Sequence, residues 1–247
     1  MSKLVLFSLM VLLAAAAVGK PPKTVVLVHG AFADGTSWEK VIPLLQAKGL
    51  HVVAVQNPLT SLADDVAATR RAIDAQTGPV ILVGHSWGGT VITEVGAHDK
   101  VAALVYVAAF APDAGQSSND LGKDGPPPPF LAHINADGAG FLALTPEGVA
   151  RDFAQDLPPA QTAVMAVTQG PIFGKAFDER VTNVAWKTRP SWFIVADKDR
   201  MIQPDLERAM AKKINAKTTT LPTSHVPMLS RPDDVATVIL AAAGAVK

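Results

Sequence analysis

The strongest constraint on the fold is a serine flanked by glycines, Gly84-His85-Ser86-Trp87-Gly88, placed between the apolar run 80–83 and a helical pattern at 90–96. A strand that turns directly into a helix bends so tightly that glycines are needed on both sides of the serine. The turn holds the serine in a strained conformation, with its hydroxyl exposed at the N-terminus of the helix. The pattern therefore predicts a strand–turn–helix unit in which Ser86 is a nucleophile.

Apolar runs bounded by turn residues recur along the chain and predict the strands of one sheet. They span residues 24–28, 51–55, 80–83, 101–107, 191–196 and 218–221. The runs are continuously apolar, which is typical of parallel strands buried on both faces. Helical segments lie between them: Ser61 and Asp64 resemble a capping box ahead of one helix, and Pro232 begins the last one. Strands that alternate with helices predict an α/β fold with a mostly parallel sheet.

The alternation breaks between about residues 113 and 185, where prolines cluster among several glycines. This stretch has helix-like pieces but no convincing strand, so we expect an insertion over the sheet rather than a separate domain. The expected organisation is a core formed by residues 20–112 and 186–247, with residues 113–185 inserted between its two parts.

The N-terminal residues 1–19 have the order of a secretory signal peptide. Lys3 precedes the apolar stretch 4–18, which ends in small residues. This stretch is shorter than the ~20 residues that a membrane-spanning helix needs. We expect cleavage after Ala17 or Gly19, a secreted or periplasmic mature protein, and no stable membrane association after cleavage. An uncleaved anchor is the alternative.

Composition excludes several classes of function. Lys plus Arg and Asp plus Glu both number 22, and no basic run is present, so we expect no nucleic-acid partner. The chain has no cysteine, which excludes disulfides, thiolate metal sites and a cysteine nucleophile. We expect neither a metal nor an organic cofactor. The sequence does not indicate an oligomeric state.

A serine nucleophile needs a base within hydrogen-bonding reach. The chain has six histidines. We expect His29 to brace the loop after the first strand and His85 to point away from the serine. His225 follows the last strand, and loops after parallel strands gather at one edge of the sheet, so His225 is predicted to be the general base.

The base needs an acid that fixes its tautomer and stabilises the imidazolium. Asp197 and Asp199 both follow the run 191–196, and Asp113 follows the run 101–107. The order Ser, Asp, His along the chain fits the hydrolase arrangement. The residue pattern alone does not separate Asp197 from Asp199.

The developing oxyanion needs backbone donors. The amide of Trp87, directly after the nucleophile, is one predicted donor. The second is expected from the loop after the first strand, in which the amide of Ala31 is preferred over that of Phe32.

The motifs resemble those of the α/β-hydrolase superfamily, in the branch of small bacterial esterases similar to plant methyl esterases and cyanohydrin lyases. The matching segments are residues 28–32, 84–89, 199–204 and 224–232. The family's acid precedes an Arg-x-Ile-x-Pro pattern, so the resemblance selects Asp199. It also implies a small, mainly helical cap at 113–185 and Ala31 as the second oxyanion donor.

These observations predict a serine hydrolase of small neutral carboxylic esters that works through an acyl-enzyme intermediate. A cofactor-free perhydrolase or lactonase with the same triad is the main alternative. The resemblance argues against a hydroxynitrile lyase, because plant lyases of this fold have lysine after the histidine and this chain has Val226. A non-catalytic binding protein is the remaining alternative, and it conflicts with the complete triad.

Apolar residues of the predicted cap are candidates to line the pocket, which would suit short acyl or aromatic groups. They are Phe130, Leu131, Phe141, Leu142, Phe153, Met165, Phe173 and Phe177. The alternative is that these residues only fasten the cap to the sheet.

Overall fold

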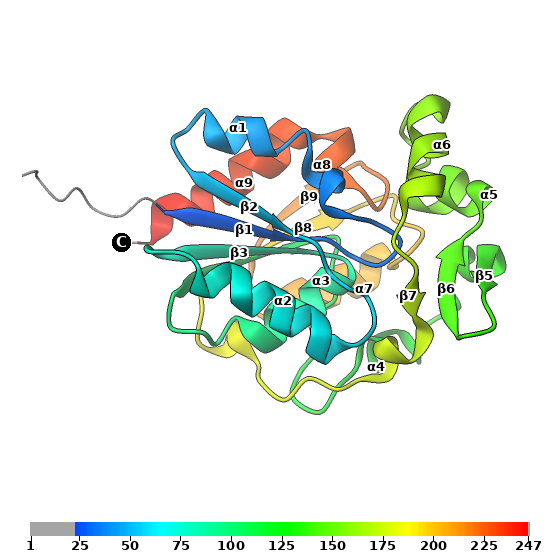
Figure 1. Ribbon diagram of the computed structural model, residues 1–247, viewed down its shortest axis with the longest axis horizontal. Coiled ribbons are helices and arrows are strands. Elements are labelled where there is room, and N and C mark those ends of the chain that lie inside the picture. The colour runs from blue at the N-terminus through cyan, green and yellow to red at the C-terminus, as the bar shows by residue number, and fades with distance from the viewer. Residues whose placement is uncertain (1–22, 247) are drawn as a thin grey trace, which may run out of the picture.

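The structure is a computed structural model that describes residues 23–246. The predicted signal peptide lies outside the described residues. Six parallel strands form the main sheet, in the order β2-β1-β3-β4-β8-β9 (Figure 1). Their bounds are β1 Thr24–Val28, β2 His51–Val55, β3 Val80–His85, β4 Val101–Val107, β8 Ser191–Ala196 and β9 Lys217–Leu221. The predicted parallel α/β sheet is confirmed, with β3 and β9 slightly longer than expected.

Burial explains why the strands are continuously apolar. Every residue of β1 and β3 is buried, because both strands are covered on both faces. The edge strands β2 and β9 keep exposed positions, which is where the polar His51, Lys217 and Thr218 lie.

Helices cover the two faces of this sheet. Helices α1 and α9 lie on one face, and α2 and α3 lie on the other (Figure 1). Helix α7 packs on β8, and the short α8 precedes α9. Their bounds are α1 Ile42–Gln46, α2 Leu62–Asp74, α3 Trp87–Val95, α7 Pro204–Lys213, α8 Pro227–Ser230 and α9 Pro232–Ala245. Short 3-10 turns lie at Gly35–Trp38 and Ala185–Lys187.

The order of the strands creates a switch point between β1 and β3. The chain leaves β1 toward β2 on one side and then returns to β3 on the other side. Loops that follow neighbouring strands diverge at such a point and leave a crevice at the carboxyl ends of the strands, where ligands bind.

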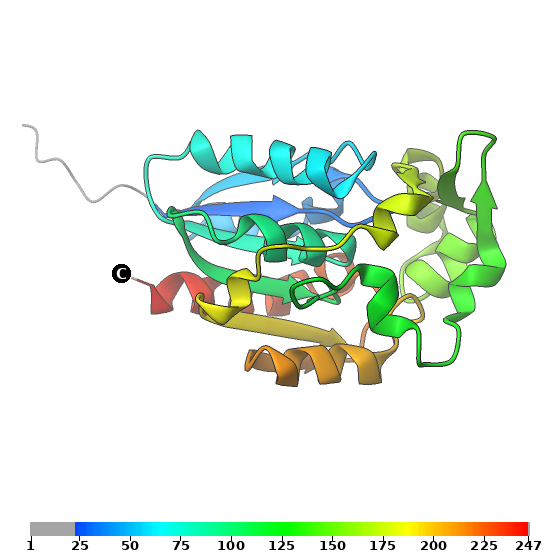
Figure 2. The same cartoon turned by 90° about the horizontal axis from the view of Figure 1, so that it is seen from below.

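The segment between β4 and β8 covers that edge as a cap (Figures 1 and 2). Its helical pieces are α4 Ser118–Gly122, η2 Pro129–His133, α5 Pro146–Gly148, the π turn η3 Val149–Phe153, α6 Pro159–Thr168 and η4 Gly174–Asp178. The cap also contains a three-stranded antiparallel sheet of β5 Ile134–Ala136, β6 Phe141–Leu144 and β7 Ile172–Phe173.

The expectation that the insertion holds no strand is therefore wrong. These strands have three, four and two residues, which is too short for an alternating pattern to show. A turn sets the pairing of β5 with β6 instead: Asp137 Oδ1 accepts from the amides of Ala139 and Phe141, and Gly140 has a φ of +87°.

Among residues 23–246, no helix is long and apolar enough to cross a membrane. The same residues contain no group of histidines and acidic side chains arranged to hold a metal ion.

Candidate active site

Ser86 lies at the bend between β3 and α3, with φ +53° and ψ −121°. Its amide donates to Val107 O at 3.2 Å, and its carbonyl accepts from the amides of Gly89 and Phe110. A left-handed φ is costly for any residue but glycine, so these bonds stabilise the strained conformation in which Ser86 lines a cavity.

The flanking glycines allow close backbone contacts. A Cβ on Gly84 would lie 2.5 Å from Gly88 O, and a Cβ on Gly88 would lie 2.5 Å from Val28 O. Any side chain at these positions would push α3 away from β1 and β3.

His225 and Asp199 come together from the loops after β9 and β8. Their side chains are buried, and His225 Nδ1 donates to Asp199 Oδ2 at 2.5 Å. Asp199 Oδ1 accepts from the amides of Met201 at 2.6 Å and Ile202 at 3.0 Å. These bonds fix the carboxylate and place the histidine proton on Nδ1, which leaves Nε2 basic.

Nε2 of His225 is buried and has no hydrogen-bond partner among the described residues. It is the atom that a serine hydroxyl would use. Asp197 is instead half-exposed and forms an ion pair with Arg208. The structure thus brings Asp199 to the histidine and leaves Asp197 at the surface.

Aromatic rings hold His225 in place. The His85 ring lies 4.7 Å from the His225 ring, and the Phe153 ring lies at 5.3 Å. His85 Nε2 donates to His225 O at 2.8 Å. Burial, and then the neighbouring His225, hold the pKa of His85 well below its usual range. His85 is therefore a neutral donor that ties the elbow to the loop of His225.

The loop after β1 approaches Ser86 closely. A Cβ on Gly30 would lie 2.6 Å from Ser86 Cβ, and Phe32 has a φ of +58°. His29 braces this loop: Nδ1 donates to Gly30 O at 2.8 Å, and Nε2 accepts from the Asn57 amide at 2.9 Å. Ala31 lines the same cavity as Ser86, while Trp87 provides the first amide of α3.

Sequence reasoning missed a buried acid behind this site. Asp65 accepts from the Trp87 indole at 2.7 Å and from the Leu59 amide at 2.8 Å. Burial raises the pKa of Asp65 to about 6. In the sequence, Asp65 resembled an ordinary acid in the first turn of a helix, and no pattern distinguished it from the exposed Asp64.

A cavity of about 330 Å³ contains Ser86. Four of the predicted pocket residues line it: Phe130, Leu131, Leu142 and Phe177. The other four lie elsewhere. Phe141 and Phe173 pack on each other, Phe153 packs on His225, and Met165 lines a neighbouring pocket.

A groove of about 660 Å³ shares walls with the cavity, including Phe110, Asn119 and Ile202.

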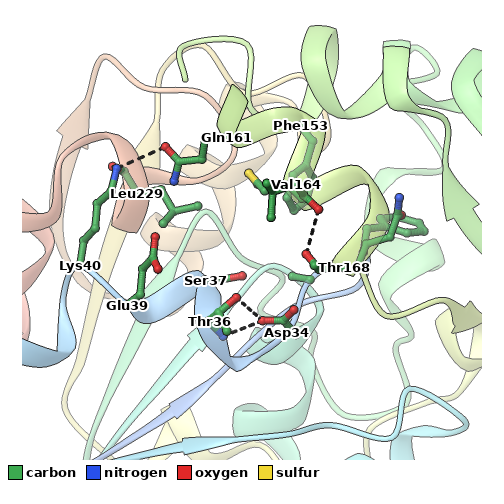
Figure 3. A pocket seen from close by; sticks show the side chains of 14 residues that line it. Asp34, Thr36, Ser37, Glu39, Lys40, Phe153, Gln161, Val164, Thr168 and Leu229 are labelled. Carbon is green, nitrogen blue, oxygen red and sulfur yellow. Dashed lines mark hydrogen bonds between the residues drawn. The ribbon is translucent and has the colours of Figure 1, made fainter. Parts of the chain in front are cut away.

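The neighbouring pocket of about 340 Å³ is lined by residues of both the cap and the core (Figure 3), and it shares Phe32 with the cavity. Its polar groups largely bond to protein: Lys40 Nζ donates to Leu229 O at 3.0 Å, and Asp34 Oδ1 accepts from the amide of Thr36. We interpret this pocket as a crevice in the interface between α6 of the cap and the core, where such contacts fasten the cap to the core.

The chain matches the model of the alpha/beta hydrolase family over residues 25–238 and belongs to that family. It is 28% identical to a pyrethroid hydrolase of Sphingobium wenxiniae, with 87% of this chain and 85% of the relative covered. It is also 28% identical to methylesterase 3 of Arabidopsis thaliana, with 87% and 94% covered. The crystal structure of polyneuridine aldehyde esterase superposes with a TM-score of 0.78 at 19% identity, covering 90% and 99%. The family and these relatives define the protein as a carboxylic ester hydrolase.

Proposed function

We propose that the protein hydrolyses small, neutral carboxylic esters through an acyl-enzyme formed on Ser86. The observation that carries the proposal is the buried His225–Asp199 pair, whose Nε2 has no partner among the described residues, together with a strained Ser86 that lines a cavity.

In the first half of the reaction, Ser86 Oγ attacks the ester carbonyl while His225 Nε2 takes its proton. The amides of Trp87 and Ala31 donate to the oxyanion that forms. The tetrahedral intermediate then collapses, the carbon–oxygen bond to the alcohol breaks, and His225 gives its proton to the leaving alkoxide.

In the second half, His225 takes a proton from a water molecule that attacks the acyl carbonyl. Collapse of this intermediate releases the carboxylic acid and returns the proton to Ser86. Asp199 remains an anion throughout and stabilises the imidazolium.

The lining of the cavity supports neutral substrates. It consists mainly of apolar side chains, with Asn119 and Ser86 as the polar ones, and no charged residue in the described part of the chain lines it. An anionic group in this cavity would lack the arginine or lysine that such groups require. The cavity suits a short acyl or aromatic group, and the adjoining groove provides room for the other half of the ester.

A series of p-nitrophenyl esters tests the proposal. We expect the highest kcat/KM at about two to six acyl carbons, as a small apolar cavity implies. Ser86→Ala should lower the rate by orders of magnitude and leave the fold intact, whereas the control Ser230→Ala, on α8, should retain activity.

A fluorophosphonate probe should label Ser86 alone. Labelling that persists in Ser86→Ala would show that another serine is the nucleophile. A maximum at long-chain emulsified triglycerides would contradict the substrate class. Peroxide-dependent oxidation without ester cleavage would favour the perhydrolase alternative.

A further inference from the structure

A second carboxyl group, that of Glu207, lies within side-chain hydrogen-bonding reach of Asp199, and the proposed reaction does not use it. Glu207 belongs to α7, which packs on β8. Glu207 is completely buried. Its Oε2 accepts from the Ala196 amide at 3.0 Å, at the end of β8. Its Oε1 is buried and has no donor among the described residues.

The two carboxyl groups have unequal shares of donors. Asp199 accepts from His225 Nδ1 and from the Met201 and Ile202 amides. Within residues 23–246, Glu207 accepts from Ala196 alone. Two adjacent buried carboxyls cannot both be ionised at low cost, and the group with more donors keeps the charge. We therefore expect Glu207 to be the protonated carboxyl of this pair and Asp199 to be the ionised one.

The electrostatics agree with this count. Burial, and then the negative charge of Asp199 and a side-chain hydrogen bond to it, raise the pKa of Glu207 well above its usual range. The hydrogen bond from the Ala196 amide, and then the positive charge of the Arg208 guanidinium, act in the opposite direction. That guanidinium is half-exposed and forms ion pairs with Asp197 and Asp205, so its effect on Glu207 is weakened.

We propose that Glu207 is a neutral carboxylic acid that donates a hydrogen bond to Asp199 and so positions it against His225. Glu207 is a positioning residue, because it acts through Asp199 and touches neither substrate nor serine. The proposal rests on the roles proposed for Asp199 and His225. A donated hydrogen bond also disperses the negative charge of Asp199, which tempers its pull on the proton of the imidazolium.

Two substitutions separate a neutral donor from an anion. In Glu207→Gln, the amide N–H can donate to Asp199 and the amide oxygen can accept from Ala196. We expect kcat and the acidic limb of the kcat/KM–pH profile to match those of the wild type.

Glu207→Met has a similar volume but no donor. We expect kcat to fall about ten- to a hundredfold, as for a lost hydrogen bond to a charged group. We also expect the acidic limb to move to higher pH, because the undispersed charge of Asp199 favours imidazolium. The control Glu147→Gln makes the same chemical change at an exposed glutamate of the cap and should alter neither.

Infrared spectroscopy gives a readout that does not depend on turnover or on the stability of Glu207→Met. At pH 8 the wild type should show the carbonyl stretch of a protonated carboxyl, and Glu207→Gln should lack it. Asp65, with a pKa of about 6, is ionised at this pH and does not contribute. Absence of the band from the wild type, or a loss in Glu207→Gln as large as in Glu207→Met, overturns the proposal. A wild type that cleaves no ester would instead refute the proposed function, while the band would still report the proton on Glu207.

Discussion

Two aspartates separated by a single residue, Asp197 and Asp199, lie in different environments. Asp199 is buried with its carboxylate on His225, whereas Asp197 is half-exposed beside Arg208. The amide of Asp199 donates to Ala196 O, which turns the loop and separates the directions of the two side chains. Spacing alone could not resolve this, because the turn after β8 decides which carboxylate points inward.

Asp199→Asn should cost about 10³- to 10⁴-fold in kcat, whereas Asp197→Asn should leave kcat nearly unchanged. The Met201 and Ile202 amides occupy Oδ1, so the asparagine NH2 must take the place of Oδ2 and face His225. That contact forces Nδ1 to accept and moves the ring proton to Nε2, which then cannot act as a base. Steady-state kinetics on both variants measure the difference, and a reversed order would identify Asp197 as the acid.

Asp65 makes stability depend on pH. Its pKa rises from 3.8 to about 6 on folding, so the folded state binds the proton more tightly than the unfolded state does. The free energy of unfolding should therefore fall as the pH rises from about 4 to about 7, by on the order of 3 kcal/mol from this residue.

Asp65→Asn removes the titration while retaining a side chain of the same shape. Urea unfolding of both proteins between pH 4 and pH 7 isolates the effect, because the other groups titrate alike and cancel in the difference. The wild type should lose stability relative to Asp65→Asn as the pH rises. Parallel curves would show that Asp65 is not held in an unfavourable ionised state.

At the scale of elements, the strand–turn–helix unit could be predicted from the sequence because its residues are close together in the chain. The glycines, the strand before them and the helix after them lie within about twenty consecutive residues, and their spacing carries the geometry. The cap was predicted less accurately, because its strands are too short to show an alternating pattern and β5 pairs with β6 through a turn at Asp137. Its apolar residues divided between the cavity and the packing of the cap, a division that depends on tertiary contacts.

Gly88→Ala should disrupt the junction of α3 with β1. The added Cβ would meet Val28 O at 2.5 Å and His29 O at 2.9 Å, and both are backbone atoms with little freedom to move. We expect a loss of about 3 kcal/mol or more in unfolding free energy, together with most of the activity. Gly244→Ala in α9 is the matched control: its Cβ would meet nothing within 4 Å, and alanine should stabilise that helix slightly. Thermal unfolding with an ester assay measures both, and equal behaviour of the two variants would argue against a close-contact role for Gly88.

At the scale of the whole molecule, the strand order explains why residues far apart in the chain meet. Strands β1, β3, β8 and β9 all run in one direction, so the loops bearing Ala31, Ser86, Asp199 and His225 reach the same edge. This convergence follows from parallel pairing and was predictable from the sequence. The contacts of Asp65 and Glu207 were not, because both acids lie on helices whose rotation about their axes is set by packing.

The proposal that the protein is exported concerns residues outside those that the structure describes. The charged, apolar and small-residue order of residues 1–19 predicts a mature protein that begins near Val18 or Lys20. Mass spectrometry of the protein from the periplasm and medium of its native host checks this. An intact Met1 or Ser2 on a cytosolic product would contradict it.

The two described ends of the chain meet at the edge of the sheet remote from the cap (Figures 1 and 2). Lys23 Nζ donates to Ala243 O at 2.7 Å and to Val246 O at 2.6 Å, which ties the approach to β1 to the end of α9. The catalytic cavity, which cap residues help to line, therefore lies at the end of the molecule opposite to the point at which a tether on the C-terminal end would be attached. Enzyme immobilised on a bead through that end would present its active site to the solution, so small esters would reach Ser86 without crossing the support.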